Sequence, residues 1–217
     1  MDNKKICFIM CVNQWEYAKE AVHYIQSLWV PDGYKIDIIT IEEAESMTEG
    51  YNAAMKDSDA KYKVYLHQDV LITEPRILEY MLQIFENPQV GMIGMVGATK
   101  LPKNGIMWYG KRIGKLYADN IYSMEEEEFG KVENKYQSVE VVDGLLMMTQ
   151  YDLEWKEDIF DKWDFYDASQ SLEFQRKGYQ VVVPYMDKPW CLHACGFLNL
   201  SDYYEERKKF LMEYKEV

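Results

Sequence analysis

The sequence predicts an α/β fold in which helices cover both faces of a mostly parallel, twisted sheet. In the first hundred residues, short apolar runs alternate with segments whose apolar residues recur at helical spacing, and this alternation builds parallel sheets. The chain has 217 residues, of which 48% are hydrophobic and 28% are charged. This balance supplies a core, and the length suits one domain. We therefore expect a single three-layer domain over residues 1–217.

In the first half, strands and helices are expected in turn. Continuous apolar runs, which suit strands buried on both faces, end at polar or turn-forming residues. The expected strands are residues 6–12, 36–41, 63–67 and 91–96. Helical spacing predicts helices over residues 18–29, 47–56 and 75–85, the last with Pro75 at its start.

Ligands of such sheets bind beyond the carboxyl ends of the strands. The residues directly after the first three strands are therefore candidates for a binding site. They are residues 11–14, 42–45 and 67–70. Among them, Asn13 is also a candidate helix cap.

The second half lacks this regular alternation. Residues 101–137 have no clean period, which predicts an irregular excursion with one hairpin, and their acidic run from Glu125 to Glu128 indicates a solvated loop or helix end. After it, we expect a strand at 139–149 broken at Asp143-Gly144, and a helix at 169–177 closed by Gly178. A strand at 179–183 and an extended piece at 191–193 follow. A last helix, to residue 214, is expected to start with a capping box of Asp202 and Glu205.

The formal net charge of −13 disfavours DNA or RNA as a partner, because a broad acidic surface repels phosphates. A local phosphate site remains possible if a divalent metal supplies positive charge. Aromatic residues make up 15% of the chain, and most are expected in the core or scattered on the surface. The aromatic stretch at residues 108–122 could form a partner surface, so a homo-oligomer is possible.

The cysteines are expected to be free thiols in a reducing cytoplasm. Residues 1–5 are polar, and the apolar run after them is too short for a signal-peptide core. No stretch approaches the roughly 20 apolar residues of a membrane span. The cysteines concerned are Cys7, Cys11, Cys191 and Cys195.

Three polar positions could carry chemistry. Asp69 follows a buried strand, where its carboxylate could hold Mg²⁺ or Mn²⁺ or could merely cap the next turn. Asp167 precedes an expected helix, either as a general base facing a cleft or as the helix N-cap. His193 is either a metal ligand or a structural side chain.

These positions belong to short segments that follow one another in a familiar order. The segments are Gly50-Tyr51-Asn52-Ala53, His67-Gln68-Asp69-Val70, Val142-Asp143-Gly144, Phe165-Tyr166-Asp167 with Arg176-Lys177-Gly178-Tyr179, and Leu192-His193. Their order and spacing resemble the family 2 glycosyltransferases with the GT-A fold, and more narrowly the streptomycin-biosynthesis StrF-type branch. The resemblance extends over about residues 5 to 200.

The resemblance implies an inverting transfer of a sugar from a nucleotide-diphosphate sugar to a hydroxyl acceptor. It implies that Asp69 is the last acid of the family's Asp-x-Asp metal motif, that His193 completes a Mn²⁺ or Mg²⁺ site, and that Asp167 is the catalytic base. It places donor binding at Asn13, Glu42, Asn52, Asp69 and Gly144.

The same resemblance divides the chain into parts. Residues 1–100 would form a nucleotide-binding half, residues 101–200 an acceptor-binding and catalytic half, and residues 201–217 a C-terminal helix.

The chain departs from the family pattern at two positions. His67 stands where the first acid of Asp-x-Asp is expected, and Tyr166 stands where many members have the Glu of a Glu-Asp pair. An alternative is therefore a catalytically inactive protein that binds sugar nucleotides on the same fold.

Two further alternatives come from other classes. A zinc site would use the four cysteines with His193, but their spacing differs from the usual Cys-x₂-Cys knuckle. A nucleotidyltransferase would show a glycine-rich loop after the first strand, and residues 11–15 contain no glycine.

Overall fold

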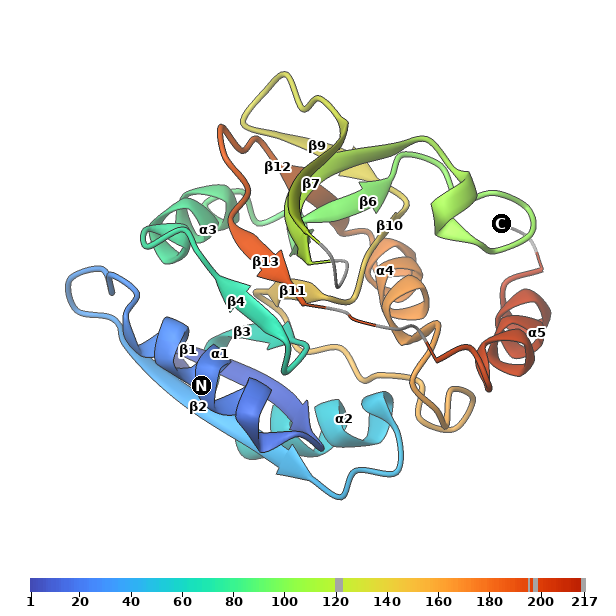
Figure 1. Cartoon of the computed structure of the whole chain (residues 1–217), viewed down its shortest axis with the longest axis horizontal. Helices are drawn as coiled ribbons and strands as arrows, with labels where there is room; N and C mark the ends of the chain where they lie inside the picture. Colours follow the sequence, from blue (N-terminus) through green and yellow to red (C-terminus); the bar gives the residue numbers. More distant parts are fainter. Residues whose placement is uncertain (120–122, 195, 197–198, 216–217) are drawn as a thin grey trace.

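The computed structural model describes residues 1–119, 123–194, 196 and 199–215 (Figure 1). The helical elements are α1 (Trp15–Gln26), α2 (Met47–Asp57), α3 (Ile77–Phe85), the 3₁₀ turn η1 (Met107–Tyr109), α4 (Tyr166–Arg176) and α5 (Tyr203–Glu213). The strands are β1 (Asp2–Val12), β2 (Lys35–Glu42), β3 (Ala60–Leu66), β4 (Val70–Ile72), β5 (Val90–Gly94), β6 (Val96–Ala98), β7 (Arg112–Asp119), β8 (Met124–Gly130), β9 (Tyr136–Val139), β10 (Val141–Val142), β11 (Leu146–Thr149), β12 (Gln180–Pro184) and β13 (Cys191–His193).

The α/β fold is confirmed, but the main sheet is mixed rather than mostly parallel. Its strand order is β2-β1-β3-β11-β5-β12-β9. The pairs β1/β2, β1/β3 and β5/β12 are parallel, whereas β11 runs antiparallel to both of its neighbours. All four residues of β11 are buried, and a fully buried strand shows no alternation that would reveal its direction in the sequence.

Another sheet packs beside the carboxyl ends of these strands, in the order β10-β6-β7-β13-β4, with β8 paired to β7. The chain passes between the sheets several times, and two of these crossings, from β5 to β6 and from β10 to β11, lie next to one another. A Cβ on Gly94 would overlap the side chain of Val142, so glycine is needed where these crossings meet. The run expected as one strand at residues 139–149 is therefore divided among three strands in two sheets.

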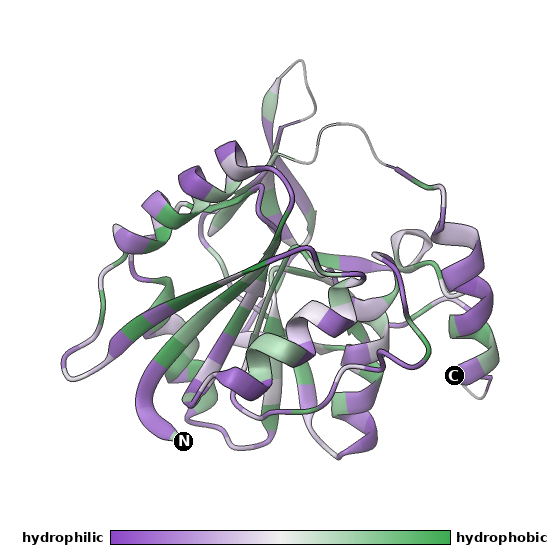
Figure 2. Cartoon of the chain, turned by 90° about the horizontal axis from the view of Figure 1, so that it is seen from below, coloured by the Kyte–Doolittle hydropathy of each residue, from purple (hydrophilic) through white to green (hydrophobic). Residues whose placement is uncertain are grey.

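The helices of the first half lie close to their expected bounds. Since β2 and β3 flank β1 on opposite sides, right-handed crossovers place α1 and α2 on opposite faces of the sheet. The Sγ atom of Cys11 lies on the α2 side, 2.7 Å from where a Cβ on Gly50 would sit. Figure 2 shows hydrophobic strands in the interior and hydrophilic turns on the outer helices.

Several local expectations are wrong. Gln14, not Asn13, is the N-cap of α1. The acidic run at Glu125 lies in the exposed strand β8, where charges on an edge discourage pairing with another chain. Asp202 is the N-cap of α5, but its side chain makes no capping hydrogen bond, so the predicted capping box is absent.

Helix α5 packs into a hydrophobic cluster separate from the main core. Phe210 and Tyr214 pack with Phe160 and Phe165, and Arg207 donates to the backbone oxygen of Asn104 at 2.6 Å. Figure 1 shows α5 beside the loop that precedes β7. None of the helices that the structure describes is both long and apolar enough to cross a membrane.

The aromatic stretch proposed as a partner surface is partly engaged within the chain. Trp108 is 43% exposed but packs edge-on against Phe129, and the guanidinium of Arg112 lies 4.7 Å from its ring centre. Tyr109 is 75% exposed. Residues 120–122 of this stretch lie outside the described residues, and an oligomer stays a prediction.

Candidate functional site

Residues from two segments far apart in the sequence meet beyond the carboxyl end of β3. One potential ligand atom from each of His67, Asp69 and His193 lies within 4.8 Å of the others. Asp69 Oδ1 and His193 Nε2 lie 3.6 Å apart. Across the described residues, this is the group of histidine, cysteine and acidic side chains that could hold a metal ion. The predicted pair Asp69 and His193 is therefore brought together, and His67 joins it.

Strand pairing positions these side chains. His67 follows β3, and its backbone N–H donates to the oxygen of Leu145 at 3.0 Å. His193 ends β13, which pairs antiparallel with β4 so that His193 lies opposite Val70. The backbone N–H of Ala194 then donates to the oxygen of Asp69 at 3.0 Å. The late histidine reaches the motif because β13 pairs with the strand that follows it.

The protonation of the cluster follows from burial and mutual contact. Burial, with the nearby His193, lowers the pKa of His67 to about 4, so its imidazole is neutral at pH 7. Burial opposes the charge on His193, but contact with Asp69 outweighs it and raises the His193 pKa. The same contact, together with the charge of His193, outweighs burial and lowers the pKa of Asp69. Asp69 is therefore an ionised ligand candidate.

Tyr166 connects this cluster to α4. The Tyr166 hydroxyl lies 2.5 Å from Nε2 of His67. Tyr166 is only 4% exposed, and burial raises its pKa well above the usual value, so the hydroxyl stays protonated. A Cβ at residue 144 would overlap the Tyr166 hydroxyl oxygen. Gly144 therefore leaves room for Tyr166 to reach His67.

Asp167 lies in the first turn of α4 and is not its N-cap, which is Phe165. Its carboxylate accepts hydrogen bonds from the backbone N–H of Gly144 at 2.9 Å and of Ala168 at 2.7 Å. Burial, with the nearby charge of Asp143, raises the pKa of Asp167 to about 7. A carboxyl group with this pKa can accept a proton near neutral pH. Phe165 has a φ of 60°, a left-handed conformation that is costly outside glycine and often marks functional sites.

A pocket of about 300 Å³ lies beside the cluster. It is lined by Cys11, Val12, Asn13, Ile41, Glu43, Ala44, Met47, His67, Gln68, Asp69 and Trp163. Most of these residues come from the segments after β1, β2 and β3, as expected from the sheet edge. Glu42, Asp167 and His193 are not among them.

Gln68 organises one wall of this pocket, and sequence reasoning missed it. Its side-chain oxygen accepts from the backbone N–H of Asn13 and Gln14 at 3.0 and 2.9 Å, while its amide donates to the Asn13 side-chain oxygen at 2.5 Å. The polar residue in the middle of the His67-Gln68-Asp69 segment therefore holds the loop after β1. Glu42 is exposed and accepts from the indole N–H of Trp15 at 3.2 Å.

Asn52 has a different environment from the one expected. Its side chain is 3% exposed, donates to the oxygen of Trp155 and to Glu157, and accepts from the N–H of Trp155. Asn52 does not line the described pocket. Its amide groups fasten α2 to the segment after β11, and its part in donor binding stays a prediction. Gly144 is also absent from the lining, and its contribution is to place Tyr166 and Asp167.

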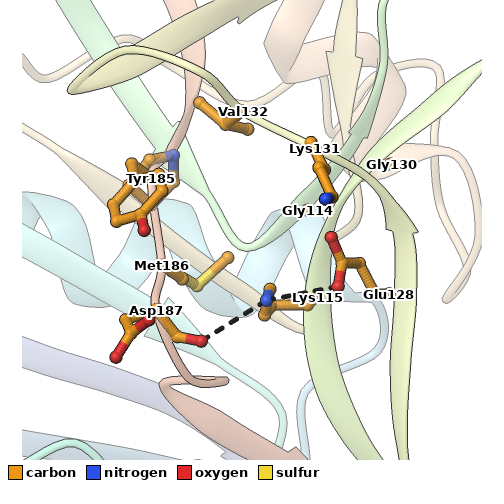
Figure 3. A pocket seen from close by; sticks show the side chains of 10 residues that line it. Gly114, Lys115, Glu128, Gly130, Lys131, Val132, Tyr185, Met186 and Asp187 are labelled. Atoms are coloured by element: carbon orange, nitrogen blue, oxygen red, sulfur yellow. Dashed lines mark hydrogen bonds and ion pairs between the residues drawn. The ribbon is translucent and has the colours of Figure 1, made fainter.

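A pocket of about 250 Å³ lies elsewhere, between the β7–β8 hairpin and the segment after β12 (Figure 3). Figure 3 shows Lys115 pointing toward Asp187 and Glu128, and its Nζ lies 3.4 Å from the backbone oxygen of Asp187 and 3.5 Å from the Glu128 carboxylate. Internal partners occupy this lysine, and none of the predicted site residues lines this pocket.

The zinc alternative has no support from the described cysteines. Cys7 and Cys191 are buried, Cys11 is partly buried, and none of the three belongs to the metal-ligand cluster. Burial raises the pKa of both Cys11 and Cys191 to about 12, as for thiols in apolar surroundings. Cys195 lies outside the described residues.

Comparison with solved structures found similar folds. A mannosyltransferase from Pyrobaculum calidifontis, PcManGT, solved with GDP-Man and Mn²⁺, is 13% identical with a TM-score of 0.63, and the match covers 99% of this chain and 65% of that one. TarS of S. aureus is 10% identical with a TM-score of 0.59, over 98% of this chain and 40% of that one. TarS 1-349, solved with UDP-GlcNAc, is 11% identical with a TM-score of 0.59, and the match covers 99% of this chain and 67% of that one.

The chain thus spans less than two thirds of PcManGT and of the longer TarS chain. A search of curated proteins gave no match. A family model described as "Glycosyltransferase like family" matches residues 7–214. This match covers nearly the whole chain, and the fold agrees with it, so the chain belongs to the glycosyltransferase-like family and has a GT-A-type α/β fold.

Proposed function

We propose that the chain transfers a sugar from a nucleotide-diphosphate sugar to a hydroxyl acceptor, with inversion at the anomeric carbon. The observation that carries this proposal is the cluster of His67, Asp69 and His193 beside the pocket at the sheet edge, in a chain of the glycosyltransferase-like family. The similar structures hold GDP-Man and UDP-GlcNAc, and we propose a donor of this class here. The sequence segments further support the StrF-type branch.

The pocket would receive the donor. Asn13 offers polar groups in a loop that Gln68 holds in place, and Glu43 and Asp69 offer carboxylates at its rim. Trp163 is 42% exposed on the same lining, and its indole would offer a surface for stacking on a base or a sugar. Glu42, held by Trp15, would lie at the outer edge. We retain Asn13, Glu42 and Asp69 as donor-binding residues.

Residues 1–100 would form the donor half of one domain. The later segments bring Asp167 and His193 to the same edge, and the C-terminal helix packs behind them. This division remains part of the proposal.

The donor set fits a divalent ion. His67, Asp69 and His193 offer two imidazoles and one carboxylate, a set that suits a transition-metal ion such as Mn²⁺ better than Mg²⁺, which prefers oxygen ligands. When bound there, the ion would offset the negative charge of the donor diphosphate. The single ionised Asp69, with contact to His193, supplies the anionic part of the site.

Asp167 would act as the base. With a pKa of about 7, a substantial fraction of Asp167 is ionised at neutral pH. The N–H groups of Gly144 and Ala168 orient its carboxylate. In the proposed reaction, Asp167 removes the proton of the acceptor hydroxyl as that oxygen attacks the anomeric carbon from the face opposite the diphosphate.

The test is a thermal-shift screen of uridine, guanosine, cytidine and thymidine sugar nucleotides, each with Mn²⁺, with Mg²⁺ and without metal. A ligand at 100 times its dissociation constant stabilises the folded state by about 2.7 kcal/mol, which gives a clear shift in melting temperature. We expect one nucleotide class to give this shift with Mn²⁺. Zn²⁺ without a nucleotide is a further control for metal binding at the two imidazoles, because it binds imidazoles more tightly than Mn²⁺ does.

The variant Asp69→Asn tests the site, and Asp57→Asn is its control because Asp57 is exposed at the end of α2. Asp69→Asn should lose the Mn²⁺-dependent part of the shift, and Asp57→Asn should keep it. Equal shifts in both variants would contradict the site. A binder that transfers sugar to no member of an acceptor panel would support the alternative, an inactive sugar-nucleotide-binding protein.

A further inference from the structure

The two positions at which this chain departs from the family pattern touch one another. His67 replaces the first acid of the metal motif, and Tyr166 replaces the acid before the proposed base. They are separated by 99 positions in the sequence, yet Nε2 of His67 and the hydroxyl of Tyr166 lie 2.5 Å apart. At this distance the imidazole and the phenol share one hydrogen bond.

The surrounding structure holds Tyr166 in this position. Its ring packs against Tyr51 and Trp155, with ring centres 6.0 and 6.1 Å away. Gly144 provides the space for its hydroxyl, since any Cβ there would overlap the phenol. The hydroxyl therefore has little freedom to move away from His67.

The direction of this hydrogen bond determines which nitrogen of His67 is available, because the Tyr166 hydroxyl can either donate or accept. A neutral imidazole carries one N–H and one lone pair. If Nε2 carries the hydrogen and donates it to Tyr166, the lone pair is on Nδ1. If Tyr166 donates instead, Nδ1 carries the hydrogen and has no lone pair to offer to a cation.

We propose that Tyr166 is a positioning residue, whose hydroxyl accepts the Nε2–H of His67 and so leaves the Nδ1 lone pair as a third metal ligand beside Asp69 and His193. This inference rests on the proposed metal site. Residues behind metal-binding histidines commonly fix the tautomer in this way.

The tautomer can be observed directly in the metal-free protein. The chain has only three histidines, so the imidazole nitrogens of a ¹⁵N-labelled sample are readily resolved by NMR, and His67→Asn assigns the signals of His67. We expect a protonated Nε2 and an unprotonated Nδ1 in the wild type. Tyr166→Phe should give a mixture of tautomers. Tyr214→Phe is the control, because it removes another buried hydroxyl that bonds Ser169 and Glu173 of the same helix.

Calorimetry with Mn²⁺ alone supplies the second measurement. Tyr166→Phe should weaken Mn²⁺ binding by roughly 10- to 100-fold, the usual effect of losing such a partner, and Tyr214→Phe should not. In a His67→Asp background, which restores the family acid, Tyr166→Phe should change the affinity by less than about threefold, because no tautomer remains to be fixed.

The outcomes separate this inference from the proposed function. A protonated Nδ1 in the wild type, or unchanged tautomer and Mn²⁺ affinity in Tyr166→Phe, overturns the role of Tyr166 while leaving the metal site in place. A wild-type protein that binds no Mn²⁺ overturns the metal site itself, and the role of His67 as a ligand with it.

Discussion

At the scale of single residues, Asp167 shows how neighbours adjust one carboxyl group. Two backbone N–H groups stabilise its charged form, but burial and the charge of Asp143 outweigh them and raise its pKa to about 7. A base works best when its pKa lies near the working pH. The environment of Asp167 therefore suits the role that the segment Phe165-Tyr166-Asp167 suggests.

Replacing Asp167 by Asn should lower the turnover number by about 10²- to 10⁴-fold, the usual contribution of a positioned base. Donor binding should be largely kept, because Asp167 does not line the donor pocket. The measurement compares sugar transfer with donor binding by calorimetry. Asp158→Asn, at an exposed position, is the control, and a wild-type rate in Asp167→Asn would exclude Asp167 as the base.

Replacing Asp143 by Asn should shift the pH profile. The base must be ionised, so kcat/KM should rise as the pH passes through the pKa of Asp167, near 7. Removing the negative charge of Asp143 lowers that pKa, and the acidic limb should move to lower pH. The side-chain oxygen of the new amide can still accept the hydrogen bond that Asp143 accepts from the N–H of Leu145. A limb that stays in place would show that Asp143 does not act on Asp167.

At the scale of elements, the site depends on where α4 begins. Phe165 adopts a left-handed conformation directly before the helix, at a cost of order 1–3 kcal/mol. The chain therefore turns sharply there, and the next two residues face His67 and Gly144. Helix α4 thus carries both Tyr166 and Asp167 on one short turn.

Gly144→Ala should disturb both residues of this turn. Its Cβ would overlap the Tyr166 hydroxyl, so the tyrosine must move, at a cost of about 1–3 kcal/mol in the free energy of unfolding. Mn²⁺ binding should weaken as well. Gly33→Ala is the control, because Gly33 has open space around it and a positive φ. It should cost stability through its backbone alone, with Mn²⁺ affinity retained. Wild-type affinity in Gly144→Ala would contradict the contact.

At the scale of the whole molecule, the last helix closes the structure behind the site. The Tyr214 hydroxyl is hydrogen-bonded to the Ser169 hydroxyl and donates to the Glu173 carboxylate, both on α4. Nζ of Lys156 lies 2.7 Å from the Glu213 carboxylate. Helix α5 therefore supports the helix that carries Asp167.

Phe210→Ala should destabilise the protein by about 3–5 kcal/mol, because Phe210 is 1% exposed within this cluster. Met212→Ala is the matched control in the same helix, since Met212 is 68% exposed and should change stability by less than about 0.5 kcal/mol. Urea denaturation measures both. If the two variants have equal midpoints, the docking of α5 contributes little to stability.

The sequence predicted the first half of the fold well, since β1, α1, β2, α2 and β3 form a local alternation. It predicted the second half less well. Residues 139–149 are mostly apolar with an expected break at Asp143-Gly144, but the chain also changes sheet before that break, between β9 and β10. A continuous apolar run shows that a segment is buried and leaves its partners and its direction open.

For the site, the sequence alone determined which residue types were available: Asp69, Asp167 and His193 in a recognisable order. Tertiary structure decided the rest. It added His67, Gln68 and Tyr166, and it placed both Asn52 and Asp167 outside the pocket lining. The physical reason is that ligand distances, tautomers and pKa values depend on contacts between strands far apart in the chain, and local periodicity carries no information about those contacts.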